Sequence, residues 1–266
     1  MRRGGDGRLG PASLCAVDRL ALLADPAVRS VFARELGRDI EYHDSIGSTQ
    51  DRARELGRAG LAMLVVADHQ TGGHGRGEKT WLSAPGASLL GSWVFRPAPA
   101  EPALFSLLAG VAVRRALGPF GVADVGLKWP NDVWLSGGKI AGCLAHGAAD
   151  HLVIGVGINV GQQELPAELA DSATTLAQAG HAIDRLALLA RLSVELDRLA
   201  DPAAHAEAMA EWRKRSITLG REVEVRESGS ATFRGRATAL AEDGALVVET
   251  EYGQQRVLAG EVRVLG

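Results

Sequence analysis

The chain has 266 residues, of which 46% are hydrophobic, and a formal net charge of −3 at pH 7. This length favours one large domain plus a small one, and the near-neutral charge excludes a general electrostatic attraction to nucleic acid. Cys15 and Cys143 are too far apart in sequence for a disulfide framework or a CxxC metal site, and no uninterrupted apolar run reaches about 18 residues, so we expect a cytoplasmic protein with no membrane partner.

The N-terminal part of the chain combines a tail with interleaved helices and strands. Residues 1–12 are glycine-rich and charged, which is typical of a flexible tail. The spacing of apolar residues predicts a helix over residues 13–36, broken at Pro26, and a helix over 51–58 capped by Ser48 or Thr49. Strands are expected at residues 61–68 and 88–95, followed by a mostly apolar helix packed on a sheet at 102–117.

The second half of the chain changes character near Leu219 and Gly220. Before that point we expect strands near residues 125–128, 133–136, 139–146 and 152–160, and helices at 184–199 and 203–215. From Arg221 the pattern becomes short alternating segments separated by turns, which predicts a small β-barrel or sandwich. The predicted units are therefore residues 1–39 (tail and helix), 40–219 (catalytic) and 220–266 (small β domain).

Residues 128–142, KWPNDVWLSGGKIAG, are the most informative stretch. Apolar residues on both sides read as strands, and the segment from Trp129 to Asp132 reads as a turn because Pro130 fixes φ. Two cations, Lys128 and Lys139, and the carboxylate of Asp132 suit an anionic, phosphate-bearing ligand with a metal ion. The alternative is a hairpin with solvated charges, although a solvent-facing turn rarely needs a bulky tryptophan.

A glycine-rich segment, DHQTGGHGRGEKTW at residues 68–81, follows the apolar run at 61–67. Its glycines permit close backbone approach, and successive N–H groups in such a loop can form an anion-binding nest. It contains neither a Walker A motif nor a G-x-G-x-x-G fingerprint. By composition alone, a mobile surface loop is as good an interpretation as a phosphate site.

Five motifs follow one another along the chain: GSTQ (47–50), the loop at 70–81, KWPND (128–132), KIAG (139–142) and GVGINV (155–160). Their sequence and order resemble those of biotin–protein ligases, and the resemblance covers roughly residues 40–266. A weaker match, RSITLG (215–220), opens the family's small C-terminal domain. The resemblance implies an α/β (α+β) fold with a mixed, mostly antiparallel sheet backed by helices, plus a C-terminal SH3-like β-barrel.

The resemblance also implies the reaction and its residues. ATP and biotin would give biotinyl-5′-AMP and pyrophosphate, and biotin would then pass to a lysine of a carrier domain. Lys139 and Arg76 are the expected catalytic residues. The expected biotin-binding residues are Ser48, Thr49, Gln50, Gln70, Gly73, His74, Gly75, Arg76, Lys139 and Gly142. The expected nucleotide-binding residues are Arg76, Lys79, Trp81, Lys128, Asn131, Asp132, Lys139 and Asn159, with Asp132 also the candidate ligand for Mg²⁺.

Several positions depart from the usual family pattern. In the glycine-rich loop, His74 replaces the first arginine, Glu78 the last glycine and Lys79 the last arginine. Gln50 stands in place of the family's asparagine, and His146 in place of an acidic residue. Because Arg76, Lys139 and Asp132 are retained, we expect activity, with a loop that closes less firmly.

The expected partner is the biotin carboxyl carrier domain of acetyl-CoA carboxylase or a related carboxylase, and a homodimer is left open. Some relatives carry an N-terminal winged helix-turn-helix, but only about 40 residues precede the first motif here, so we expect a monofunctional ligase that does not bind DNA. Two rival interpretations remain: a lipoate-type acyl ligase, and a non-catalytic protein that binds biotin or biotinyl-AMP.

Overall fold

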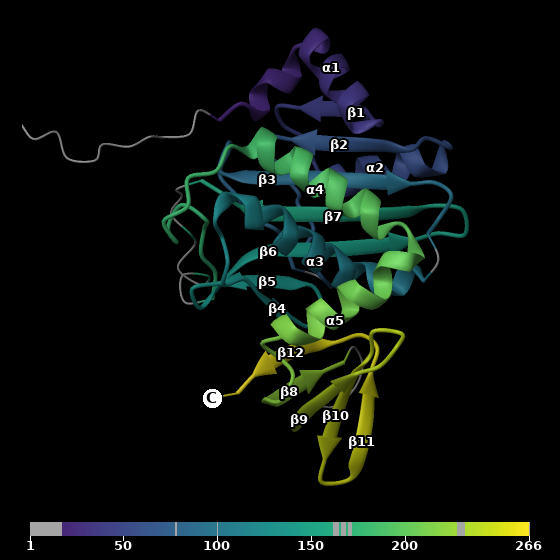
Figure 1. Cartoon of the computed structure of the whole chain (residues 1–266), viewed down its shortest axis with the longest axis vertical. Coiled ribbons are helices and arrows are strands. Elements are labelled where there is room, and N and C mark those ends of the chain that lie inside the picture. Colours follow the sequence, from purple (N-terminus) through teal and green to yellow (C-terminus); the bar gives the residue numbers. More distant parts are fainter. Residues whose placement is uncertain are drawn as a thin grey trace, which may run out of the picture.

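The computed structural model describes residues 18–77, 79–99, 101–161, 165, 169, 172–227 and 232–265. The described chain forms two sheets, a large one carrying helices on its faces and a small one at the C-terminal end (Figure 1). The predicted helical pattern at 13–17, with Cys15, lies outside the described residues, as does Glu78.

The large sheet has seven strands in the order β1-β2-β3-β7-β6-β5-β4. Their bounds are β1 Asp39–His43, β2 Met63–Ala67, β3 Ser88–Phe95, β4 Gly126–Lys128, β5 Asp132–Leu135, β6 Gly138–Gly147 and β7 Leu152–Asn159. Only β1 and β2 run parallel, and every other neighbouring pair is antiparallel. The predicted mixed, mostly antiparallel sheet is therefore confirmed.

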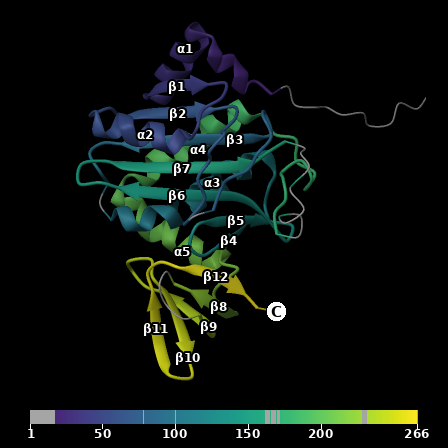
Figure 2. The same cartoon turned by 180° about the vertical axis from the view of Figure 1, so that it is seen from behind.

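Helices cover both faces of this sheet. They are α1 Pro26–Leu36, α2 Thr49–Arg58, α3 Phe105–Leu117, α4 Arg185–Leu199 and α5 His205–Arg215, with 3₁₀ turns at Leu20–Ala24, Pro102–Leu104, Gly118–Phe120 and Pro202–Ala204. Helices α3, α4 and α5 lie on one face (Figure 1) and α2 on the other (Figure 2). Central strand β3 is buried along its whole length because it is covered on both sides.

Helix α2 matters most for the site because its start is fixed by a capping residue. Ser48 is the N-cap, and its Oγ accepts a hydrogen bond from the backbone N–H of Asp51 at 3.4 Å. Ala53 and Leu56 then pack on the sheet against Val65 and Val153. The first turn of α2 is thereby held at the sheet surface, as the sequence predicted.

The segment Pro102–Phe120 is long and apolar enough, by length and composition alone, to cross a membrane. In this fold it contains α3, which packs between the sheet and helices α4 and α5. Leu108, Val111 and Val113 are fully buried there. Its apolar composition is that of a core helix, which agrees with the predicted helix packed on a sheet.

The small sheet has five antiparallel strands in the order β11-β10-β9-β8-β12. They are β8 Glu222–Arg226, β9 Phe233–Leu240, β10 Leu246–Thr250, β11 Gly253–Val257 and β12 Glu261–Val264. Val223 and Val225 of β8 and Val248 of β10 are fully buried. The alternating segments predicted after Arg221 are these strands.

Two local predictions were incomplete. Strand β1 was not predicted, because only Ile40 of its five residues is buried and a partly exposed edge strand lacks a clear alternating pattern. The continuous helix expected up to Pro26 is instead a 3₁₀ turn at Leu20–Ala24. Asp25 caps α1 by accepting from the backbone N–H of Ala27 at 2.8 Å, so the helix begins only at Pro26.

Candidate active site

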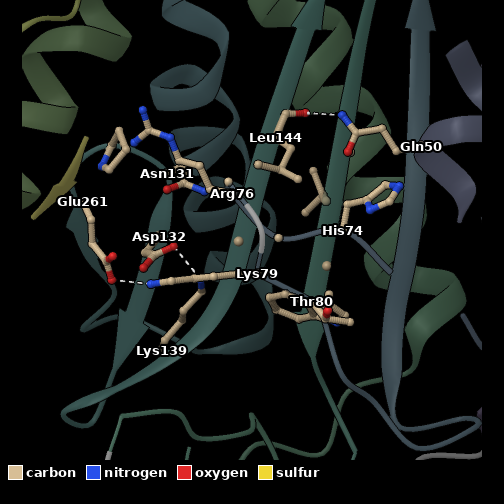
Figure 3. A pocket seen from close by; sticks show the side chains of 18 of the residues that line it. Gln50, His74, Arg76, Lys79, Thr80, Asn131, Asp132, Lys139, Leu144 and Glu261 are labelled. Atoms are coloured by element: carbon tan, nitrogen blue, oxygen red, sulfur yellow. Dashed lines mark hydrogen bonds and ion pairs between the residues drawn. The ribbon is translucent and has the colours of Figure 1, made fainter. Parts of the chain in front are cut away.

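A cavity of about 920 Å³ lies between the large sheet, the glycine-rich loop and the edge of the small sheet (Figure 3). It is lined by most of the predicted site residues: Ser48, Thr49, Gln50, Gln70, His74, Gly75, Arg76, Lys79, Trp81, Lys128, Asn131, Asp132, Lys139 and Gly142. Segments from Ser48 to Val262 thus meet at one site. Gly73 and Asn159 are predicted residues that do not line it.

One end of the cavity is uncharged and its hydrogen-bonding groups are held in place. The Gln70 Oε1 atom accepts from both the backbone N–H of Thr49, at 2.7 Å, and its Oγ1, at 2.9 Å. The Thr49 Oγ1 also lies 2.9 Å from the Ser92 Oγ. Because Thr49 and Ser92 are buried, this network is shielded from water and offers a fixed surface to a neutral polar ligand.

The wall of this end is formed by Gln50. Its Nε2 donates to the carbonyl of Leu144 at 3.3 Å, so the side chain lies across the strands (Figure 3). A Cβ added to Gly155 would lie 2.8 Å from the Gln50 Oε1, so glycine at 155 makes room for it. His74 is turned away, since its Nε2 lies 2.7 Å from the Asp51 Oδ2.

The other end of the cavity is charged. The Lys139 Nζ lies 2.6 Å from the Asp132 Oδ1, and Lys79 forms an ion pair with Glu261 of β12 (Figure 3). The Lys128 Nζ lies 5.0 Å from the centre of the Trp134 ring. Burial lowers the pKa of Lys128, and the nearby carboxylate of Asp132 opposes that shift. This end suits a ligand that carries several negative charges.

Trp81 lies flat on the sheet between the two ends. A Cβ at Gly157 would be only 2.7 Å from its Cε2 atom, and a Cβ at Gly142 only 3.1 Å from its Cζ3 atom. The Lys139 Nζ lies 5.7 Å from the indole ring. Glycine is therefore needed at positions 142 and 157, because the backbone there lies directly against the flat Trp81 ring.

Arg76, like Lys79, extends from the loop toward the small sheet. Its Nη1 donates to the carbonyl of Gly260 at 2.8 Å, and its Cζ lies 5.6 Å from the centre of the Trp129 ring. Burial lowers the pKa of its guanidinium, and Asp132 opposes that shift.

Sequence reasoning missed the contribution of the small sheet and of two central strands to the cavity. The lining also includes Leu90, Ser92, Leu144, Gly155, Val156, Gly157, Arg226, Glu227, Thr232, Gly260 and Glu261. The GVGINV motif signalled β7, but the prediction placed its contact at Asn159. That side chain is buried, and its Nδ2 donates to the Thr174 carbonyl at 3.1 Å.

The charged end offers few ligands for a metal ion. Among the described residues there is no group of three or more His, Cys, Asp or Glu side chains placed to hold one. Asp132 provides one carboxylate, which Lys139 already contacts. One protein carboxylate fits a Mg²⁺ ion that arrives with phosphate oxygens and water, and does not fit an all-protein cage.

Comparison with known proteins places this cavity in a family. Residues 45–159 match the model of the biotin/lipoate A/B protein ligase family, and residues 218–265 match the biotin protein ligase C-terminal domain. These ranges cover the seven-stranded sheet from α2 onward and the five-stranded sheet. The fold and site are therefore those of a protein ligase with two characteristic modules.

Similarity to individual proteins shows which kind of protein ligase this chain resembles. The chain is 34% identical to the bifunctional ligase/repressor BirA of Bacillus subtilis over 245 residues, covering 86% of this chain and 75% of that protein. It is 35% identical to the biotin–[acetyl-CoA-carboxylase] ligase of Mycobacterium tuberculosis over 209 residues, covering 75% and 78%. The biotin protein ligase of Aquifex aeolicus in complex with biotin and ATP superposes with a TM-score of 0.72 at 29% identity, covering 85% and 98%. This chain belongs to the biotin protein ligase family.

Proposed function

We propose that this protein is an ATP-dependent biotin–protein ligase. It forms biotinyl-5′-AMP and pyrophosphate from biotin and ATP, and then transfers biotin to a carrier lysine. The observation that carries the proposal is a single cavity with a neutral, hydrogen-bonding end and a charged end, in a chain of this family. Biotin has a neutral ring at one end and reacts with ATP at the other. It therefore matches a cavity with one neutral end and one charged end.

The neutral end is assigned to the biotin ring. The ureido group has both donor and acceptor edges, and the Ser48, Thr49 and Gln70 side chains supply complementary groups. Gln50 closes the wall beside the ring, and Gly75 of the glycine-rich loop lines the same cavity. Gly142 lies at the floor of this cavity, beneath the Trp81 ring.

The charged end is assigned to the reacting groups and the nucleotide. Adenylation places negative charge on the α-phosphate and on the leaving pyrophosphate, and Lys139 and Arg76 stabilise that charge because they are held at the site beforehand. Lys79, Lys128 and Asn131 contact phosphate oxygens, and Trp81 covers the base or the biotin tail. When bound, Mg²⁺ supplies further neutralisation of phosphate charge, with Asp132 as its ligand.

The second step requires an amine and the exclusion of water. The glycine-rich loop closes over the adenylate, which limits hydrolysis until the ε-amine of the carrier lysine attacks the mixed anhydride and releases AMP. Because two relatives are named for acetyl-CoA carboxylase, we propose its biotin carboxyl carrier domain as the acceptor. We further propose that residues 40–219 form the catalytic domain and residues 220–266 the small one.

The test is pyrophosphate exchange into ATP with biotin or lipoate as the acid, followed by transfer to an acetyl-CoA carboxylase carrier domain. Biotin-dependent exchange and labelling of the carrier lysine are expected. Exchange that responds to lipoate in place of biotin would support the lipoate-type alternative. Binding of biotin without exchange would support a non-catalytic binding protein.

A further inference from the structure

Trp129, which sequence analysis singled out as unexpectedly bulky for a turn, lies where three segments of the chain meet. It directly follows β4, and only 2% of its surface is exposed. Its backbone N–H donates to the Thr218 Oγ1 at 3.0 Å, on the segment leading into the small sheet. Its indole Nε1 donates to the Gly244 carbonyl at 3.0 Å, in the turn that joins β9 to β10.

The third segment is the glycine-rich loop, through Arg76. The guanidinium Cζ lies 5.6 Å from the centre of the Trp129 ring, within the range of a cation–π contact. The other described contact of this guanidinium is the carbonyl of Gly260, just before β12. Arg76 is therefore supported by a ring bonded to the small sheet and by a carbonyl that belongs to it.

The carbonyl of Gly244, which accepts the hydrogen bond from the indole N–H, lies in a tightly packed turn. Gly244 has φ of +84°, and a Cβ there would lie 2.9 Å from the Leu107 Cδ1 of α3. The β9–β10 turn is thus pressed against the helix that covers the large sheet. A displacement of the small sheet would move this carbonyl and, with it, the ring beneath Arg76.

Other buried tryptophans lack this arrangement. The Trp93 Nε1 donates to the Ser193 Oγ of α4, entirely within the large-sheet part of the fold. Trp212 is buried in α5 with 1% of its surface exposed. These residues fill the core, whereas Trp129 joins the core, the small sheet and a loop residue of the cavity.

We infer that Trp129 is a positioning residue that makes the placement of Arg76 depend on the docking of the small sheet, and that it serves the adenylation step and not the binding of the biotin ring. This inference rests on the proposed function. The uncharged end of the cavity is built from Thr49, Gln70 and Ser92, which are bonded to one another and not to Trp129. Biotin affinity and adenylation should therefore separate when Trp129 is changed.

The experiment compares Trp129→Phe, which keeps a ring but removes the indole N–H, with Trp129→Leu, which removes both. Trp212→Phe is the matched control for a truncated core tryptophan. Biotin affinity is measured by calorimetry without ATP, and pyrophosphate exchange gives kcat and the KM for ATP. We expect exchange to fall about tenfold in Trp129→Phe, because the loss of the indole N–H leaves the buried Gly244 carbonyl unpaired and displaces the ring beneath Arg76. Exchange should fall further in Trp129→Leu, because the cation–π contact with Arg76 is also lost. Biotin affinity should stay within about twofold of the native value.

A double-mutant cycle with Arg76→Gln tests whether Trp129 acts through Arg76. Adenylate formation is followed in single turnovers with enzyme in excess, so that slow variants are measurable. Trp129→Leu should cost little when Arg76 is already absent. Equal losses in both backgrounds, a parallel loss of biotin affinity, or a Trp129→Phe variant no slower than Trp212→Phe would each overturn the inference. Absence of biotin-dependent exchange in the native chain would instead reject the proposed function.

Discussion

The ammonium group of Lys139 on β6 lies 2.6 Å from the carboxylate of Asp132 on β5, although the residue directly opposite Asp132 is Gly142. The ladder shifts register between Val133 and Trp134, and the lysine side chain runs along the sheet to reach its partner. The Trp81 ring lies on its other side, 5.7 Å away. Lys139 is thus directed into the cavity before any ligand binds, which is the condition for electrostatic catalysis.

Replacing Lys139 should remove activity while sparing the fold. The side chain is 30% exposed and its ion pair is only partly buried, so Lys139→Ala should leave the melting temperature nearly unchanged. Adenylate synthesis should fall by about two orders of magnitude, the scale of one lost preorganised contact. Pyrophosphate exchange measures this, and Lys214→Ala on the exposed side of α5 is the control. Near-native exchange in a folded Lys139→Ala variant would remove Lys139 from the mechanism.

Adding a methyl group at Gly157 should displace Trp81. The new Cβ would lie 2.7 Å from the Trp81 Cε2 atom, closer than real contacts allow, so the indole ring must shift. We expect Gly157→Ala to weaken biotin and ATP binding by about tenfold and to blue- or red-shift Trp81 fluorescence. Gly118→Ala is the matched control, since nothing lies within 4 Å of a Cβ there. Unchanged binding in Gly157→Ala would show that Trp81 is free to reposition without loss.

Much of this fold was predictable because its signals are local. Strand β3 and helix α3 are long and apolar, and Ser48 precedes a helix as a capping residue should. The KWPND turn and the KIAG strand each carry a charged side chain at one end, and antiparallel pairing brings them together. Sequence spacing alone placed Lys139 and Asp132 close together but left a hairpin with solvated charges open, and the family resemblance assigned them to one site.

The remaining features depend on packing between distant segments. The contact between Arg76 and the carbonyl of Gly260 joins residues 184 positions apart, and no sequence pattern relates them. Asn159 has the residue type and location of a ligand contact, yet its amide is bonded to the Thr174 carbonyl. Strand β1 was missed because its single buried residue, Ile40, gives no periodic signal. The contacts of Arg76 and Asn159 follow from tertiary packing, which propensity and periodicity do not encode.

The affinity for ATP should begin to weaken at a lower pH than the ordinary pKa of a lysine would predict. Burial lowers the pKa of Lys128 below its ordinary value of 10.5, and the positive charge is lost as pH rises through the lowered pKa. The KM for ATP should therefore begin to rise at a pH below the ordinary lysine pKa, and Lys128→Arg should flatten that rise because arginine stays protonated. Identical pH profiles for the native chain and Lys128→Arg would contradict this role, and Lys214→Arg controls for general effects of the exchange.

The departures in the glycine-rich loop should make this ligase release its adenylate faster than the usual motif would. His74 contacts Asp51 and Lys79 pairs with Glu261, so each side chain already has a carboxylate partner. Arginine at either position can keep that partner and still present further donors to phosphate. Each charge-assisted contact is worth roughly 1.5–3 kcal/mol, so His74→Arg combined with Lys79→Arg should slow release by about tenfold or more.

Glu78 is the third departure, and for it the expectation comes from the sequence. A carboxylate in a phosphate-binding loop repels the ligand, so Glu78→Gly should slow release in the same direction while restoring backbone freedom. The measurement is dissociation of preformed biotinyl-adenylate in a single turnover, trapped with excess unlabelled biotin and ATP, with Lys214→Arg as a charge-conserving control. Slower release in both the double variant and Glu78→Gly would show that the loop residues set retention of the intermediate. Release as fast as in the native chain would mean that the contacts of His74 with Asp51 and of Lys79 with Glu261 already compensate for the missing arginines.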